Sequence, residues 1–200
     1  MSGIDERDDD WGEGGAAATL PDDWAAQVHR FWFVDHGEPQ WFGGGAAFDA
    51  EVAATLAPWR EALRHRPVEA FLTDSQTALA AVILFDQVPR NVHRGTAEAF
   101  ATDDAALAIA KAAVAAGMDD GLSVDERLFL YLPFEHSEQI DDQLDALRLI
   151  GGLGRSDLSE YAQKHFEVIK RFGRFPHRNA ALGRADRPGE AEAVAAGAHW

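Results

Sequence analysis

The stretch from Tyr131 to Glu138 holds an imidazole, two carboxylates, a hydroxyl, two aromatic rings and a helix-breaking proline within eight residues. Groups of this kind are costly to bury without partners, so a segment built only for packing does not need them. An imidazole beside a carboxylate can accept and donate a proton near neutral pH. We therefore interpret His136 as a candidate catalytic acid–base group, with Glu135 as its partner.

His165 is the second candidate for acid–base chemistry. A helix from Phe134 to about Ile150 would place His136 on its apolar side with Ile140 and Leu144, and the next predicted helix would place His165 on an apolar stripe. Two inward histidines on consecutive antiparallel helices are expected to meet in the core, where His165 would orient or assist His136. In the alternative interpretation, each imidazole packs and donates a hydrogen bond to a carbonyl or a carboxylate.

Two proline-containing loops, each of which follows a predicted helix, carry most of the candidate ligand-binding residues. These candidates are Arg90, Asn91, Arg94, Arg174, His177, Arg178 and Asn179, and Glu138 joins them from the stretch around His136. A guanidinium near a helix N-terminus is a ready site for an anion. In the alternative interpretation, Asp86, Glu135 or Glu138 pair with these arginines and only attach loops to helices.

These residues favour a small-molecule site. In the leading hypothesis, His136 and Glu135 turn over a small anionic metabolite by acid–base chemistry, with no cofactor or metal, and the anion is held by Arg90, Arg174 and Arg178. A second hypothesis is a non-catalytic, tetratricopeptide-like scaffold that binds a peptide or protein in a concave groove, for which exposed Trp and Phe side chains would be evidence.

The third hypothesis is a metal-dependent enzyme. Its ligands would be His136, His165, His177 and Glu135. On the predicted helix, Glu138 lies about 160° from His136. Metal ligands must converge on one point, so this separation counts against a single metal site there.

The composition narrows the classes of partner and compartment. The chain of 200 residues has a net charge of −16, which argues against nucleic acid, because a phosphate backbone is bound by a basic face. Its longest apolar run, Ala78 to Phe85, is too short to span a bilayer, and the N-terminus lacks the pattern of a signal peptide. The absence of cysteine fits a reducing compartment. We therefore expect a soluble, cytoplasmic protein without a membrane span.

The pattern of the whole chain predicts an all-α protein. Residues 1–19 are acidic and then rich in Gly and Ala, which predicts a disordered tail, and residues 20–200 are expected to form one helical domain. Helical periodicity recurs along this domain, and no alternating β-branched run is long enough for a strand. We expect antiparallel helix pairs, with Pro89 ending one helix and Pro133 another.

Asp86–Asn91, Tyr131–Glu138 and Arg171–Asn179 form three separate sequence blocks. Together they resemble a bacterial family known as domain of unknown function 924, over roughly residues 24–190. The resemblance implies an all-helical, tetratricopeptide-like fold, a right-handed superhelical array of helix pairs. It implies no established reaction. The family pattern usually has Phe where Val88 stands.

Overall fold

The computed structural model describes residues 20–198, and within that range every regular element is helical and no β-strand occurs. The all-α class predicted from the sequence is therefore confirmed. The predicted tail, residues 1–19, lies outside the described residues.

Most elements are α-helices joined by short turns of tighter or wider helix. The α-helices are α1 (Trp24–His29), α2 (Glu38–Gly43), α3 (Ala46–Thr55), α4 (Ala57–Leu63), α5 (Ser75–Val82), α6 (Val88–Val92), α7 (Asp103–Ala115), α8 (Val124–Glu135), α9 (Ile140–Gly151), α10 (Ser156–Phe172) and α11 (Glu190–Ala195). The π-helical turns are η1 (Arg30–Asp35) and η3 (Ile83–Gln87), and the 3-10 turns are η2 (Val68–Phe71), η4 (Ala97–Phe100) and η5 (Pro176–Arg178).

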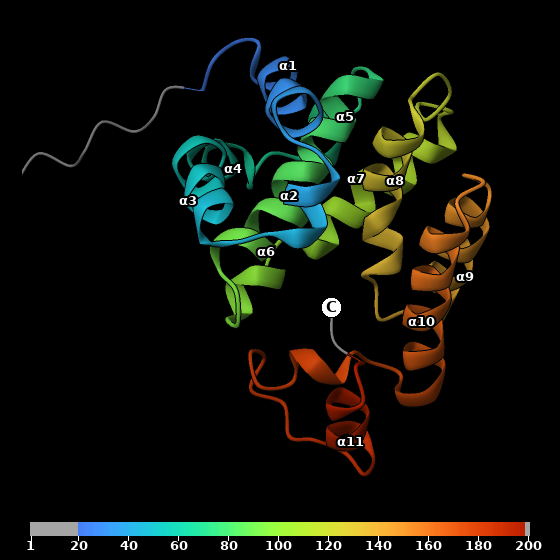
Figure 1. Cartoon of the computed structure of the whole chain (residues 1–200). Helices are drawn as coiled ribbons and strands as arrows, with labels where there is room; N and C mark the ends of the chain where they lie inside the picture. The colour runs from blue at the N-terminus through green and yellow to red at the C-terminus, as the bar shows by residue number, and fades with distance from the viewer. Residues whose placement is uncertain (1–19, 199–200) are drawn as a thin grey trace, which may run out of the picture.

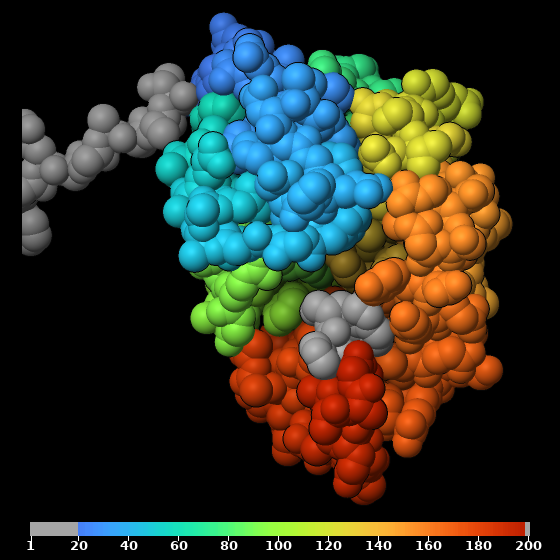
Figure 2. Space-filling view, viewed as in Figure 1, coloured from blue at the N-terminus to red at the C-terminus, as the bar shows by residue number. Residues whose placement is uncertain are grey.

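Neighbouring helices pack against one another around an apolar core (Figure 1). α9 packs against both α8 and α10, and α5 contacts α1, α7 and α8. The segment after α10, which contains η5 and α11, packs below the green region around α6 and beside α10 (Figure 2). A regular right-handed superhelical array of helix pairs stays a prediction. Among the described helices, none combines the length and the apolar character needed to cross a membrane.

α5 and the π turn that follows it lie in the centre of the core. Every residue from Ala78 to Asp86 is buried. Burial of each larger apolar side chain here stabilises the fold by roughly 1.5–3 kcal/mol. Asp86 ends this apolar run and is 0% exposed, so the core itself fixes the position of a buried carboxylate.

Helical structure does not end at Pro89, contrary to the prediction, but continues from α5 through η3 into α6. A proline inside a helix leaves the carbonyl four residues earlier, here that of Phe85, without its backbone donor. The hydroxyl of Thr102 donates to this carbonyl at 2.6 Å. This replacement hydrogen bond explains how the helix accommodates Pro89, and it keeps Asp86 and Arg90 on one continuous segment.

The prediction that Pro133 ends a helix is also wrong. α8 continues through Pro133, and α9 begins only at Ile140. His136 therefore lies in the connection between the two helices. The inward side predicted for α9 is wrong as a consequence, since Ile140 and Leu144 are exposed. Gln143 is buried instead. Its side-chain amide donates to the backbone carbonyl of Glu135, at the end of α8, at 2.6 Å, which satisfies this buried donor.

Candidate active site

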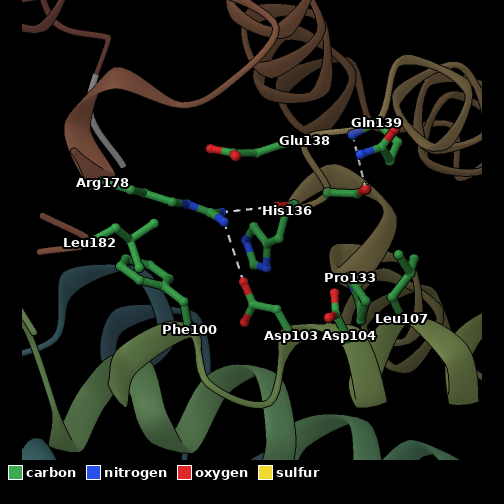
Figure 3. Close-up of a pocket in the computed structure, with 11 residues that line it drawn as sticks. Phe100, Asp103, Asp104, Leu107, Pro133, His136, Glu138, Gln139, Arg178 and Leu182 are labelled. Carbon is green, nitrogen blue, oxygen red and sulfur yellow. Dashed lines mark hydrogen bonds and ion pairs between the residues drawn. The ribbon is translucent and has the colours of Figure 1, made fainter. Parts of the chain in front are cut away.

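A cavity of about 340 Å³ opens where three parts of the chain meet (Figure 3). The start of α7 contributes Asp103 and Asp104, the α8–α9 connection contributes His136 and Glu138, and the segment after α10 contributes Arg178. Small-molecule sites commonly measure about 300–1,000 Å³. The cavity therefore has the size for a small ligand.

His136 is held by Asp86, which the core places at the edge of the cavity. Nδ1 of His136 lies 2.7 Å from Oδ1 of Asp86. An ionised carboxylate only accepts hydrogen bonds, so Nδ1 carries the proton and donates it. Within residues 20–198 no hydrogen bond to Nε2 of His136 is formed, so this nitrogen keeps its lone pair. Asp86 lies in the π turn η3, a kind of turn that is frequent at functional sites.

The surrounding charges set the protonation of both groups. Burial alone would raise the pKa of Asp86, but the charge of Arg90, with hydrogen bonds from His136 and Gln87, holds it well below its usual value. Burial lowers the pKa of His136, and the charge of Arg90 lowers it further against the opposing effect of Asp86. At neutral pH the pair is therefore a carboxylate and a neutral imidazole.

Arg90 and Arg178, which come from the two stretches predicted as proline-containing loops, share one carboxylate. Arg90 donates to both oxygens of Asp103, at 2.8 and 2.9 Å. Arg178 donates to the same carboxylate at 3.3 Å. Both guanidinium groups also lie near the ring of Phe100, at 5.7 and 4.7 Å from its centroid. The two predicted loops thus meet at Asp103.

Arg178 is the guanidinium that lines the cavity. The residue is only 6% exposed, and Nη2 donates to the backbone carbonyl of His136 at 3.0 Å. Its Nε is buried and has no hydrogen-bond partner among the described residues. Burial and the charge of Arg90 lower the pKa of Arg178 to about 10, against the opposing charge of Asp103. Arg178 is therefore charged at neutral pH and keeps unused capacity to donate.

Glu135 does not pair with His136, contrary to the prediction. Nδ1 of His165 lies 2.9 Å from Oε1 of Glu135 and 2.9 Å from the carbonyl of Tyr161. The ring centroids of His136 and His165 are 6.3 Å apart, so the predicted meeting of the two histidines in the core is confirmed. The lining of the cavity includes neither Glu135 nor His165.

Three of the predicted ligand-binding residues bind carboxylates away from the cavity. Asn91 and Arg94 both donate to Asp49 of α3. Arg174 donates to both oxygens of Glu190 in α11, at 2.8 and 2.7 Å. Arg94 and Arg174 are therefore paired internally, as the alternative interpretation holds, but with Asp49 and Glu190 and not with the carboxylates predicted; Arg90 does contact one of those, Asp86.

The other predicted residues near the second loop differ in their access to the cavity. Asn179 donates to Asp186 and does not line the cavity. Glu138 does line it, but its two oxygens accept from Arg184 at 2.7 and 3.0 Å. Burial, together with neighbouring cations, lowers the pKa of His177 to about 3, and His177 is not part of the lining.

Asp103 and Asp104 line the cavity and are not among the candidate residues of the sequence analysis. Asp103 and Arg178 lie 75 residues apart in the chain, and no local pattern links them. The sequence holds a weak signal for Arg184, since Gly183-Arg184 follows the stretch Arg171–Asn179 much as Arg94-Gly95 follows the stretch Asp86–Asn91.

Within residues 20–198 no group of three or more histidines and carboxylates is arranged to hold a metal ion. Nδ1 of His136 and Nδ1 of His165 each face a carboxylate at hydrogen-bond distance. The geometry gives no support to the metal-dependent hypothesis.

The family profile described as bacterial protein of unknown function (DUF924) matches residues 28–198. The chain belongs to this family. A solved structure described as the protein of unknown function ATU0120 from Agrobacterium tumefaciens is 38% identical to the chain, with a TM-score of 0.82. That match covers 88% of this chain and 98% of the other. No match is found among curated proteins. Membership of the DUF924 family confirms the resemblance predicted from the three sequence blocks, and it assigns no reaction.

Proposed function

We propose that the protein is an enzyme that binds a small polar molecule in the cavity and transfers a proton on it with His136. One observation carries this proposal, the buried carboxylate that holds a cavity-lining imidazole in one tautomer. The 2.7 Å contact between Asp86 and Nδ1 leaves Nε2 as the ring nitrogen available to a bound molecule. Carboxylate–histidine pairs with this arrangement act as general bases.

Asp86 would act through His136 as a positioning residue. It fixes the tautomer and stabilises the imidazolium that forms when Nε2 takes a proton. In serine proteases, replacing the corresponding aspartate by asparagine lowers kcat by about 10⁴-fold, because the wrong tautomer results. The burial of Asp86, at 0% exposure, supports the same role here, since water cannot replace its hydrogen bond.

Arg178 would stabilise negative charge that develops on the bound molecule. Its guanidinium and the ring of His136 border the same cavity (Figure 3). A pre-positioned donor of this kind contributes about 10²–10³-fold to kcat. The combination suits attack of water on a carbonyl group, or removal of a proton next to one. His165 and Glu135 would support the ring of His136 from the core side.

The anionic metabolite and the peptide-binding scaffold have weaker support. Arg90 and Arg174, which were expected to hold an anion, each bind a carboxylate of the protein through two hydrogen bonds. For the scaffold, exposed Trp and Phe side chains were expected, and within residues 20–198 only Phe42 meets that description. Neither alternative gains a specific observation in its favour.

The first test follows the chemistry of His136 directly, because that needs no known substrate. Diethyl pyrocarbonate acylates a neutral, accessible imidazole nitrogen, and mass spectrometry of peptides separates the histidines. We expect His136 to be acylated several-fold faster than His165 in the folded protein. In ¹⁵N spectra at neutral pH, Nε2 of His136 should appear unprotonated and Nδ1 protonated. The opposite tautomer, or an unreactive His136, would exclude the proposed role.

The second test is turnover on a panel of small esters and amides. His136→Gln keeps a side-chain amide that can donate to Asp86 and removes the base. His165→Gln is the matched control, since it alters a carboxylate–histidine pair that does not line the cavity. Hydrolysis that survives His136→Gln unchanged would contradict the proposal.

A further inference from the structure

Carboxylates outnumber cations in the lining of the cavity. Asp103, Asp104 and Glu138 line it, and Arg178 is the cation among the lining residues. His136 is neutral when its Nδ1 alone carries a proton. The lining itself is therefore acidic, in contrast to the arginine-rich site that the sequence pattern predicted.

Three arginines around the cavity are matched in charge by three carboxylates. The three ion pairs are Arg90 with Asp86 at 3.1 Å, Arg178 with Asp103 at 3.3 Å and Arg184 with Glu138 at 2.7 Å. No positive charge is left over for a carboxylate or phosphate of a ligand. An anion in the cavity would lie beside the carboxylates of Asp103, Asp104 and Glu138, and like charges held close together repel.

Asp104 is the exception among the lining carboxylates, since it forms no ion pair within residues 20–198. It lies in the first turn of α7. In Figure 3 its carboxylate is beside Pro133, and Arg178 reaches towards the opposite side of His136. A bound molecule can therefore meet a free carboxylate at one end and a guanidinium at the other.

Arg178 gives an independent indication of a ligand. Its side chain is more than nine-tenths buried, and its Nε has no hydrogen-bond partner among the described residues. A buried donor left without an acceptor costs about 1–3 kcal/mol, and an oxygen of a bound molecule that reaches the guanidinium from the cavity would offset part of that cost. Because its charge is already offset by Asp103, an uncharged oxygen suits this position better than a carboxylate.

We infer that the molecule bound beside His136 is a small amine, with its ammonium group at Asp104 and an uncharged oxygen, such as a carbonyl, at Arg178. This inference rests on the proposed function, because it names the substrate class of the same cavity. It reverses the charge of the ligand predicted from the sequence. An exposed carboxylate strengthens binding of an ammonium group modestly, by roughly two- to fivefold in affinity.

The test compares three matched four-carbon amides, namely 4-aminobutanamide, butanamide and succinamate. They share a carbonyl oxygen and differ at the other end, which is cationic, neutral or anionic. Binding to the full chain is followed by amide chemical shifts of Phe100, Leu107 and Leu182, at ligand concentrations up to tens of millimolar. We expect the amine to bind best, butanamide next and succinamate least.

Two variants test whether Asp104 is the residue that causes the preference for the amine. Asp104→Asn should reduce the affinity for 4-aminobutanamide to that for butanamide. Asp141→Asn, which changes an exposed carboxylate in the first turn of α9, should leave the preference intact. Tighter binding of succinamate, an unchanged preference in Asp104→Asn, or no shift with any of the three compounds would each overturn the inference.

Failure of the amine inference can be distinguished from failure of the proposed function. His136→Gln should keep the preference for the amine, because Asp104 and Arg178 are unchanged, while it removes turnover. Normal tautomer and reactivity of His136 without an amine preference would refute only the substrate class. An amine preference with an unreactive His136 would refute only catalysis.

Discussion

Asp86–His136 and Glu135–His165 both place a carboxylate beside Nδ1 of an imidazole, yet of the two histidines His136 lines the cavity and His165 does not. In both pairs a carboxylate oxygen faces Nδ1, at 2.7 and 2.9 Å. The side chain of His136 is 15% exposed and that of His165 is 5% exposed. A buried carboxylate–histidine pair is therefore not in itself a sign of catalysis. Access to the second ring nitrogen separates a candidate base from a packing contact.

The two pairs also differ in their electrostatic surroundings. Asp86 lies 3.1 Å from Arg90, so its carboxylate stabilises the guanidinium of Arg90 and also accepts the hydrogen bond of His136. His165 instead lies against the ring of Phe175, with centroids 5.6 Å apart. Breaking the first pair should therefore disturb a charged network, whereas breaking the second should disturb packing and a hydrogen bond.

Loss of the base should have the largest effect. We expect His136→Gln to lower turnover by at least about 10²-fold, the low end for general acid–base catalysis, and His165→Gln to lower it by less than tenfold. The measurement is kcat on any ester or amide that the wild-type chain hydrolyses, with thermal unfolding to show that both variants are folded. Equal losses in the two variants would mean that the histidines act as one structural unit.

Removal of the carboxylates should affect stability unequally. Asp86→Asn takes the counter-charge from a buried cation, which costs about 3 kcal/mol in the free energy of unfolding. Glu135→Gln removes a carboxylate that lies 2.9 Å from Nδ1 of His165, while the hydrogen bond from this nitrogen to the carbonyl of Tyr161 remains, so the cost should be about 1 kcal/mol. Urea unfolding at neutral pH measures both. A larger loss in Glu135→Gln would show that Arg90 is satisfied by Asp103 alone.

The Asp86–His136 pair should change the free energy of unfolding in two separate pH ranges. The folded pKa of His136 lies below its value near 6.5 in the unfolded chain. The unfolded state then takes up a proton first, and stability falls as the pH drops below about 6.5. The folded pKa of Asp86 lies below its unfolded value of about 3.9. Its contribution is therefore present above that pH and is lost as the pH falls through the folded pKa.

Variants of His136 and Asp86 show which of the two residues causes the loss of stability in each pH range. In urea unfolding across pH 3 to 7, His136→Gln should flatten the slope just below about 6.5. Asp86→Asn should weaken the steeper loss near the acid end. If His136→Gln leaves the whole profile unchanged, the imidazole is not kept neutral by its surroundings.

The sequence predicts local features of this site well and long-range partners poorly. The apolar stripe around His165 predicts an inward ring, and the residue is 4% exposed. The place of His136 was predicted with the wrong neighbours, because a helix was expected to begin at Phe134 and α9 begins at Ile140. His136 therefore lies outside α9, and the helical angles that related it to Ile140 and Leu144 do not apply.

Partners across the chain carry no such local pattern. Asp86 and His136 are 50 residues apart, whereas the partner predicted for His136, Glu135, is the adjacent residue. The pairing depends on how α8 meets η3 and α10 in the core, which is set by packing of side chains from all three. Residue type therefore indicates that a polar site exists, while the choice between Asp86 and Glu135 as the partner of His136 needs the fold.

The smallest expected effect concerns the carboxylate that Arg90 and Arg178 share. Asp103→Asn preserves shape and removes one negative charge, which leaves the two arginines with Asp86 as their remaining carboxylate. Succinamate or inorganic phosphate should then bind a few-fold more tightly to the variant than to the wild-type chain. Asp104→Asn is the control, because Asp104 has no arginine partner and its loss should not create an anion site. Chemical shifts of Leu107 and Leu182 report the binding. If neither anion gains affinity in Asp103→Asn, then the shape of the cavity, and not its charge balance, is what excludes anions from the neighbourhood of His136.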